Sequence, residues 1–448
     1  MNAPHATAEQ AKLGPVLATG LVAGNMIGSG VYLLPATLAT VGNISLLGWL
    51  VATVGALLMA GVFSGLVVLR PDIDGVGDYA RVGLGRYLGF QSGLAYWVSD
   101  WTGVIAVAVA VTGYLTVFLP ILHQPLAGVA SSVAVVWLVT LVNVIGPRFV
   151  GKLGGLTLVM GLLPIVSVAL FGWLWFDPHL FLSAWNVSGQ PPLQAVQTSL
   201  VLIFWAFTGM ESAIVAAAVV RRPERNVPIA TVGGVAIAAV VYILASAAIG
   251  GVMRQSELAH SSAPFAAAVL RMAGPLAASA VAICALAKTL GTVSGITLLT
   301  AETTRSSAAI GDFPKFLASV RSDGAPVVSL VFLAILETVT LVLTISPTVG
   351  RQFGVLIDIS TVLTLVMYGW CALALVRFAG AVRSPGWRLA VRTCGVLAFV
   401  FCLWTILASE RRLLIVSLVF LAATLPAWGA TRLAGRARIG HTEAPDRP

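Results

Sequence analysis

The chain has 448 residues, of which 58% are hydrophobic and only 10% are charged, and its mean hydropathy is +0.97. A soluble protein of this composition could not cover its surface with polar groups, so a soluble globular fold is excluded. The formal net charge of +9 does not indicate a nucleic-acid-binding protein, because the basic residues lie in short gaps between apolar runs rather than in one patch.

Apolar runs long enough to cross a bilayer recur along nearly the whole chain, since a hydrocarbon core of about 30 Å takes roughly 20 residues per helix. They lack the period-two alternation of strands, so each is predicted as a helix. The sequence therefore predicts one all-α integral membrane domain. Its twelve expected spans are Leu13–Leu34, Ile44–Leu69, Tyr87–Leu119, Leu126–Ile145, Leu153–Phe176, Ala195–Val220, Pro228–Met253, Pro275–Ser307, Pro326–Ile345, Phe353–Val376, Leu389–Ala408 and Leu413–Ala430.

The basic residues orient these spans. Twelve spans place both termini on one side, and 20 of the 26 lysines and arginines fall on that side. Because cytoplasmic segments are enriched in lysine and arginine, we expect cytoplasmic termini in a bacterial inner membrane. Residues 1–12 form the N-terminal tail, and residues 431–448 form a short basic tail that we expect to be disordered. The pair Arg411–Arg412 is the one discordant outer segment.

Two spans carry signals of an interrupted helix. The first contains Gly28, Ser29 and Gly30, and the sixth contains Gly209 followed by Glu211. Glycine disfavours a continuous helix, and the two spans hold the same position in two five-helix units. Transporters built from inverted repeats break matching helices in this way, and the exposed backbone amides bind an anionic substrate group. The alternative is that the glycines only allow close helix packing.

Charges inside a bilayer are costly and usually functional. Glu211 beside the second break is a candidate for gating or coupling, or else a buried carboxyl that ties helices together. Lys288 either forms an ion pair with Asp100 or Asp358, or acts as a cation stand-in or proton-coupled lysine. The remaining carboxylates within spans, for which a structural role is favoured, are Glu302 and Glu337.

Other side chains limit the chemistry. Tyr96 and Trp205 are mid-span aromatics that can hold an organic cation by cation–π attraction or simply pack. All five histidines lie in tails or loops, and the four cysteines lie in apolar segments without metal-ligand spacing. An enzyme would need a nucleophile with its base, or a metal cluster, so we expect neither catalysis nor a metal or other cofactor.

Several stretches carry a resemblance to the amino acid–polyamine–organocation superfamily. The most specific run from Gly24 to Val31, from Trp205 to Ser212 and from Pro223 to Ala230, with weaker likeness at 185–189 and 261–265. The likeness covers nearly the whole chain. It is greatest to the basic amino acid/polyamine antiporter group, first to arginine/agmatine antiporters and then to putrescine/ornithine antiporters.

The resemblance implies a leucine-transporter-like fold of five-plus-five inverted repeats, at residues 13–178 and 192–378, with two additional helices at 388–430. It also implies a homodimer, for which the sequence shows no interface signature. The implied activity is exchange of an amino acid for a related amino acid or its decarboxylated amine by alternating access.

The resemblance also implies residue roles. The backbone of Gly28, Ser29 and Gly30 matches the segment that receives the substrate carboxylate, and Asn25 and Met26 belong to the same motif. Trp205 matches an aromatic that stacks on the substrate and closes the near gate. The remaining matches are Tyr96, Glu211 and Tyr368 at the far gate, and Ser360 as a site serine in the tenth span.

The sequence departs from this pattern at the pocket. Ile296 replaces a tryptophan that packs on the arginine side chain, and Val104 replaces an asparagine that reads its polar head. Both losses make the pocket less suited to a guanidinium, and Asp100, Lys288 and Asp358 are charges not expected from these relatives. The leading hypothesis is an exchanger of small amino acid or polyamine substrates. A proton-coupled symporter is the alternative, which Lys288 supports.

Overall fold

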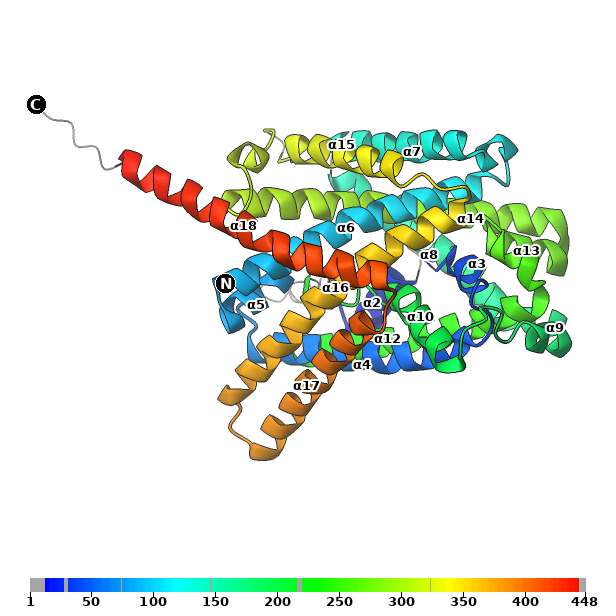
Figure 1. Cartoon of the computed structure of the whole chain (residues 1–448), viewed down its shortest axis with the longest axis horizontal. Helices are drawn as coiled ribbons and strands as arrows, with labels where there is room; N and C mark the ends of the chain where they lie inside the picture. Colours follow the sequence, from blue (N-terminus) through cyan, green and yellow to red (C-terminus); the bar gives the residue numbers. More distant parts are fainter. Residues whose placement is uncertain are drawn as a thin grey trace, which may run out of the picture.

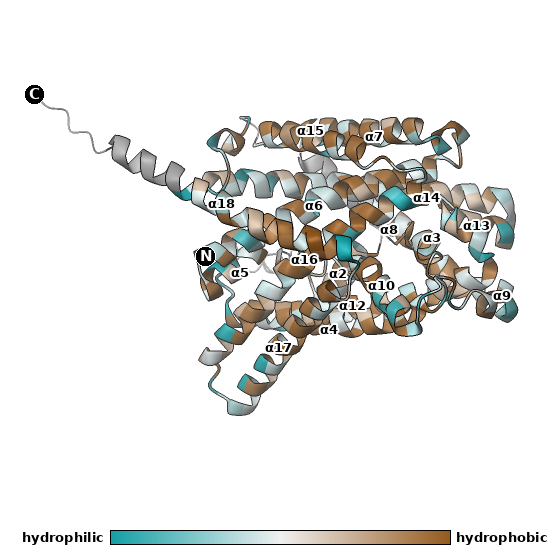
Figure 2. Cartoon of the chain, viewed as in Figure 1, coloured by the Kyte–Doolittle hydropathy of each residue, from teal (hydrophilic) through white to brown (hydrophobic). Residues whose placement is uncertain are grey.

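The structure, a computed structural model, describes residues 13–27, 31–73, 75–145, 147–215, 220–322 and 324–442. Over these ranges the secondary structure is helical, with a single isolated bridge between Leu13 and Val220 (Figure 1). Hydrophobic residues predominate along most of the helices, as Figure 2 shows. The predicted all-helical membrane fold is confirmed.

The helices follow the predicted order. They are α2 (Pro15–Met26), α3 (Leu34–Leu38), α4 (Ser45–Leu69), α5 (Val76–Leu84), α6 (Arg86–Leu115), η1 (Pro120–His123), α7 (Pro125–Ile145), α8 (Pro147–Phe171), η2 (Gly172–Trp175), α9 (Pro178–Ser183), α10 (Pro192–Trp205), α11 (Ser212–Val215), α12 (Pro223–Val252), α13 (Gln255–Ala259), α14 (Pro264–Ala309), η4 (Lys315–Ala318), α15 (Val327–Leu343), α16 (Val349–Phe378), η5 (Ala379–Ala381), α17 (Pro385–Leu407) and α18 (Arg411–Thr442). Among the described residues, nine helices are long and apolar enough to cross a bilayer, and three shorter apolar helices, α2, α10 and α15, occupy the remaining predicted positions. The count of twelve crossings stays a prediction.

Helix packing repeats itself between the two halves of the chain. The two most extensive pairs are α6 with α16 and α14 with α8. In the numbering of the predicted spans, α6 and α16 are spans three and ten, and α14 and α8 are spans eight and five. If each helix is replaced by the helix five spans away, the first pair becomes the second. The contact of α2 with α12 exchanges in the same way with that of α10 with α4. This pattern supports two equivalent five-helix units, whose limits at 13–178 and 192–378 stay a prediction.

Two helix boundaries bear on the sequence prediction. A break at Gly274 (φ 81°) divides α14, so its longer part begins at Pro275, where the eighth span was predicted, and a further helical segment from Pro264 precedes the break. The C-terminal tail was wrongly expected to be disordered from Arg432, since α18 continues as helix to Thr442.

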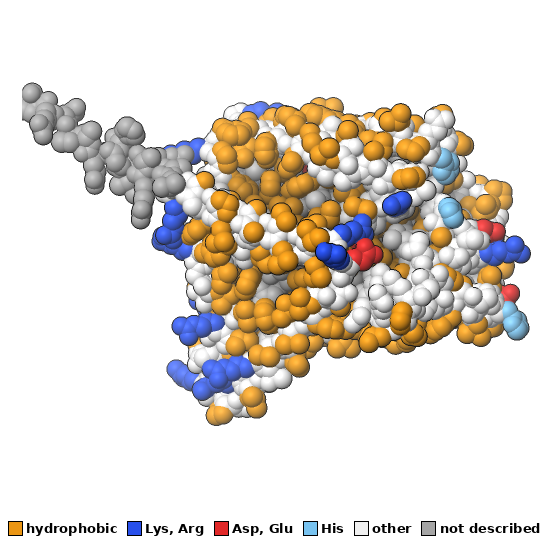
Figure 3. Space-filling view, in the orientation of Figure 1, with side chains coloured by type: hydrophobic (Ala, Val, Ile, Leu, Met, Phe, Trp, Pro, Cys, Tyr) orange, Lys and Arg blue, Asp and Glu red, His pale blue; other side chains and the backbone are white. Residues whose placement is uncertain are grey.

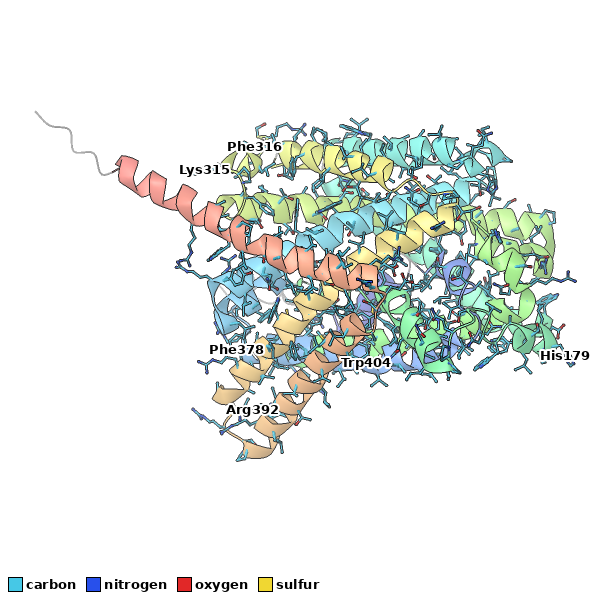
Figure 4. All side chains as sticks on the ribbon, in the orientation of Figure 1. His179, Lys315, Phe316, Phe378, Arg392 and Trp404 are labelled. Atoms are coloured by element: carbon cyan, nitrogen blue, oxygen red, sulfur yellow. The ribbon has the colours of Figure 1, made fainter. Side chains whose placement is uncertain are left out.

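Lysine and arginine side chains gather at one end of the molecule. Figure 3 shows basic residues at the end where α5 and the C-terminal half of α18 lie. Figure 4 places Lys315, Phe378 and Arg392 at this end, and His179 at the opposite end. The arrangement follows the charge asymmetry from which the orientation was predicted.

Candidate functional site

The first span is interrupted as predicted. Helix α2 ends at Met26, and Ile27 has an extended backbone (φ −75°, ψ 97°). Among the described residues that follow, helix begins again at Leu34, in α3. Met26 is buried whereas Asn25 is exposed. The predicted carboxylate-binding residues Gly28, Ser29 and Gly30 lie outside the described residues.

The sixth span is interrupted at the matching place. Helix α10 ends at Trp205, the chain turns through 206–211, and α11 begins at Ser212. Gly209 has a φ of +96°, a conformation that favours glycine. A Cβ atom on Gly209 would lie 3.7 Å from the carbonyl oxygen of Asn25. The two breaks therefore face each other.

Glu211 ties the second break to α16. Its Oε2 atom accepts hydrogen bonds from the Gly209 amide at 3.0 Å and from the Tyr368 hydroxyl at 2.5 Å. The break leaves backbone donors without helical partners, and the buried carboxylate satisfies one of them. The structure thus brings together two of the three side chains predicted for the far gate, Glu211 and Tyr368. The third, Tyr96, lies on α6, which packs against α16, and its place in the gate stays a prediction.

Asp100 adds a second carboxylate near this gate. It follows Tyr96 by one helical turn on α6. Its Oδ2 atom is buried and has no hydrogen-bond partner among the described residues. An unpaired buried carboxylate oxygen is costly, so Asp100 is a candidate to accept a proton or an organic cation.

Lys288 contacts the end of α2 and neither of the aspartates considered for it. Its Nζ atom donates to the Gly24 carbonyl oxygen at 3.3 Å. Within the described ranges it forms no ion pair with Asp100 or Asp358, so that alternative from the sequence is wrong. The carbonyl end of a helix carries partial negative charge, which explains why a cation lies there.

The near-gate candidate Trp205 is almost completely buried, at 3% exposure. Its ring meets Phe353 of α16 edge-on, with centroids 5.5 Å apart. Leu202, one turn earlier on α10, and Gly354, next to Phe353, both line a cavity of about 590 Å³. The aromatic pair therefore lies beside this cavity, at the point where α10 ends.

Ser360 belongs to a buried hydroxyl network between α6 and α16. Its Oγ donates to the Ser99 carbonyl at 2.9 Å, and the Ser99 Oγ donates to the Ser360 carbonyl at 2.9 Å. Thr364 lies 2.5 Å from the Ser99 hydroxyl. The reciprocal bonds fasten the two helices to each other. The partners Ser99 and Thr364 were not singled out from the sequence.

Asp358 pairs with a residue that the sequence had marked only as discordant. The Arg412 guanidinium, from the first turn of α18, donates to the Asp358 carboxylate at 2.8 Å. The same guanidinium meets Glu410 at 2.8 Å. All three residues line the 590 Å³ cavity, together with parts of α3, α10, α13 and α16. The isolated basic pair in an outer segment was the one sequence signal for this cluster.

The remaining candidates lie apart from these contacts. Val104 is fully buried on α6, and Ile296 is partly buried against the main core. Glu302 pairs with Arg305 at 2.7 Å. Glu337 is fully buried, and neither of its carboxylate oxygens has a partner in the described part of the chain. The place of Ile296 in a substrate pocket stays a prediction.

Comparison with known proteins identifies the family. The family model described as amino acid permease matches residues 13–428. The chain belongs to the amino acid permease family. It is 35% identical to the cadaverine/lysine antiporter of Escherichia coli (strain K12), over 87% of this chain and 88% of the relative. It is 33% identical to the putrescine transporter PotE of Haemophilus influenzae, over 90% of this chain and 92% of the relative.

A solved structure shows the same fold. The crystal structure of MhsT in complex with L-phenylalanine aligns with a TM-score of 0.58 and covers 88% of this chain and 98% of that chain, at 15% identity. The predicted family and the five-plus-five membrane fold are confirmed. This permease is therefore a multi-pass membrane transporter that works by alternating access, and not an enzyme.

Proposed function

We propose that this permease exchanges an amino acid with a cationic side chain for its decarboxylated amine across the bacterial inner membrane, with both termini cytoplasmic. The observation that carries the proposal is the meeting of two helix breaks, where the Asn25 carbonyl approaches Gly209 and Glu211 caps the second break. Relatives that share a third of its residues are a cadaverine/lysine antiporter and putrescine transporters.

The substrate carboxylate is assigned to the backbone of residues 28–30, with Asn25 and Met26 beside it. Unpaired amides between two helical segments bind an anion without a cationic side chain. A decarboxylated amine lacks the group that these amides bind, so its affinity depends more on the other end of the site.

The ammonium end is assigned to the acidic side of the site. Glu211, beside the second break, and Asp100, with its unpaired Oδ2, supply two carboxylates, and Tyr96 lies one helical turn from Asp100 on α6. A primary ammonium needs a compact acceptor group rather than the flat fork that matches a guanidinium. The absence of a tryptophan at Ile296 and of an asparagine at Val104 favours a primary amine over a guanidinium in the same way.

Two gates would alternate around this site. The near gate is the pair Trp205–Phe353, and the far gate is the set Tyr96, Glu211 and Tyr368. Breaking the Tyr368–Glu211 bond opens the far gate, whereas turning Trp205 away from Phe353 opens the near gate. The hydroxyl network that joins α6 to α16 makes these two helices move together. Tyr96 on α6 and Tyr368 on α16 therefore keep their positions relative to each other while the gates open and close.

Counterflow tests the exchange. Purified permease in liposomes preloaded with unlabelled lysine should take up labelled cadaverine or lysine, whereas empty liposomes should take up almost none. Liposomes preloaded with leucine serve as the control for side-chain charge. Equal uptake into empty and preloaded liposomes would contradict exchange. Failure of both cationic compounds to support counterflow, with leucine active, would contradict the proposed substrate class.

A second candidate function is proton-coupled symport of the same substrates. It is favoured by Lys288, which is buried and bound to the carbonyl end of α2, and by the unpaired Oδ2 of Asp100. Either group can exchange a proton when the adjoining helices move. Concentrative uptake into empty liposomes, driven by an imposed pH gradient and abolished by a protonophore, would establish symport in place of exchange.

A further inference from the structure

The cavity beside Trp205 is lined by an acidic side chain, Asp358, that already forms an ion pair with a basic side chain of the protein, Arg412. Asp358 is nearly buried in the cavity wall, with its side chain 10% exposed, whereas the Arg412 side chain bonded to it is 50% exposed. The exposed partner is long and flexible, and the buried one is short and fixed on α16. The pair is therefore a fixed carboxylate covered by a movable guanidinium.

Arg412 has a second acceptor in the same cavity. Its Nε meets the Glu410 carboxylate at 2.8 Å, while its other nitrogen holds Asp358. If another cation takes Asp358, the guanidinium keeps Glu410 and is not left unpaired. The cost of displacing Arg412 is lowered accordingly, because an exposed pair contributes little and a paired charge needs no new partner. Figure 3 shows a group of acidic and basic side chains near the middle of this face, where α16 and the start of α18 lie in Figure 1.

The other basic side chains that line the cavity are those of Arg351 and His260. Arg351 precedes Asp358 by seven residues on α16, which places it about 10 Å farther along that helix. The acidic part of the cavity is thus confined to Asp358 and Glu410, and both contact Arg412. A volume of about 590 Å³ leaves room for a small solute beside them.

We propose that Asp358 forms a recognition site for the ammonium group of a substrate entering through this cavity, and that Arg412 is a tethered competitor which the substrate displaces. The inference rests on the proposed function, because it requires a substrate that carries an ammonium group. The site precedes the near gate, so it raises the concentration of cationic substrate next to Trp205 and Phe353. It also gives a role to Arg412, one of the two basic residues in the discordant outer segment.

Substituting Asp358 and substituting Arg412 should change the KM for cadaverine in opposite directions. If the ion pair were only structural, the two substitutions would have the same effect. With Asp358→Asn, the apparent KM for cadaverine added to the cavity side should rise about five-fold, as expected for loss of a partly exposed charge pair. With Arg412→Gln, the same KM should fall by a similar factor of about five, because the competitor is gone. The KM measured from the opposite face should not change in either variant.

The measurement is counterflow of labelled cadaverine in right-side-out and inverted membrane vesicles. Arg411→Gln is the matched control, since it removes the neighbouring arginine, for which no ion pair is found among the described residues. A rise in both variants, or no difference from Arg411→Gln, would overturn the proposal. Because Arg412 is half exposed, Arg412→Gln is expected to fold. The direction in which it changes the KM for cadaverine therefore tests the proposal even if Asp358→Asn does not fold.

Binding separates this inference from the proposed function. Cadaverine affinity of the detergent-solubilised variants, measured by thermal shift, should follow the same opposite order without any transport. Opposite shifts in a permease that fails to exchange would support the recognition site and refute exchange. Equal affinities in a permease that does exchange would refute the recognition site alone.

Discussion

The hydroxyl of Tyr368 donates to the carboxylate of Glu211 at 2.5 Å, and the same Oε2 atom accepts the Gly209 amide at 3.0 Å. One carboxylate oxygen therefore joins α16 to the point where the sixth span is interrupted. The bond is buried, and Phe63 packs edge-on against the Tyr368 ring with centroids 5.0 Å apart. Any movement that separates α16 from this break must first release Glu211.

Glu211→Gln should reduce cadaverine counterflow at least ten-fold. Glutamine preserves the shape of the side chain and one acceptor oxygen, but it removes the charge that holds the break and the ammonium group, an interaction of about 1.5–3 kcal/mol. Glu302→Gln is the matched control, since Glu302 pairs locally with Arg305. Tyr368→Phe, which keeps the ring contact with Phe63, should cause a smaller loss. Wild-type rates in Glu211→Gln would remove it from the gate.

Trp205→Ala should abolish exchange while the protein remains folded in the membrane. The alanine removes the ring that meets Phe353 edge-on, so the near gate no longer closes. Trp205→Phe keeps an aromatic face and should retain part of the activity. Trp404→Ala, at a more exposed tryptophan on α17, controls for the loss of an indole. Counterflow and size-exclusion profiles are the measurements, and normal turnover in Trp205→Ala would reject its gating role.

The helix breaks could be predicted because their signals are local. Gly209 supplies a backbone conformation that other residues rarely adopt, and a glutamate two residues later is out of place in a bilayer unless it bonds to something. Each signal lies within a few residues of the break that it marks. The same holds for the span positions, since about 20 apolar residues in a row suffice to predict a crossing.

The charge pairs could not be predicted, because they join distant segments. Asp358 and Arg412 are 54 residues apart, and the discordant basic pair marks Arg412 without indicating that its partner is Asp358. Lys288 was considered with aspartates, yet it bonds to a backbone carbonyl of Gly24, 264 residues away. Every residue has a backbone carbonyl, so the sequence does not show which carbonyl accepts the bond. The partner of a buried charge is therefore the part of the site that requires coordinates.

Gly161→Ala should destabilise the permease and disturb Lys288. A Cβ atom at this position would lie 2.2 Å from the Cγ and 2.5 Å from the Cβ of Lys288, close to the backbone of α14, where the side chain cannot move aside. Overpacking of this kind costs about 1–3 kcal/mol. Thermal unfolding in detergent is the measurement. Gly295→Ala on α14 is the control, since its Cβ would meet open space.

A second variant, Lys288→Met, separates the effect of Gly161→Ala on stability from any effect on proton coupling. Lys288→Met keeps the length of the side chain that packs on Gly161 but removes the bond to the Gly24 carbonyl. If the lysine couples transport to protons, uptake in Lys288→Met should lose its response to an imposed pH gradient while retaining counterflow. Gly161→Ala should share this change if it displaces the lysine. If Gly161→Ala unfolded at the same temperature as Gly295→Ala, the space between Gly161 and Lys288 would be wide enough for a methyl group, and the overpacking argument would fail.

Ile296→Trp should shift the substrate preference towards arginine. The residue lies on α14, partly buried against the main core, and a tryptophan there restores the flat surface on which a guanidinium stacks. The measurement is competition by arginine, lysine and cadaverine against labelled lysine counterflow. Ile296→Leu controls for the substitution itself, because it keeps size and polarity. Inhibition by arginine should strengthen several-fold relative to lysine, as expected for a contribution of about 1 kcal/mol from one cation–π contact. An unchanged profile in a folded Ile296→Trp protein would place this residue outside the substrate pocket, and the preference for a primary amine would then rest on Asp100 and Glu211.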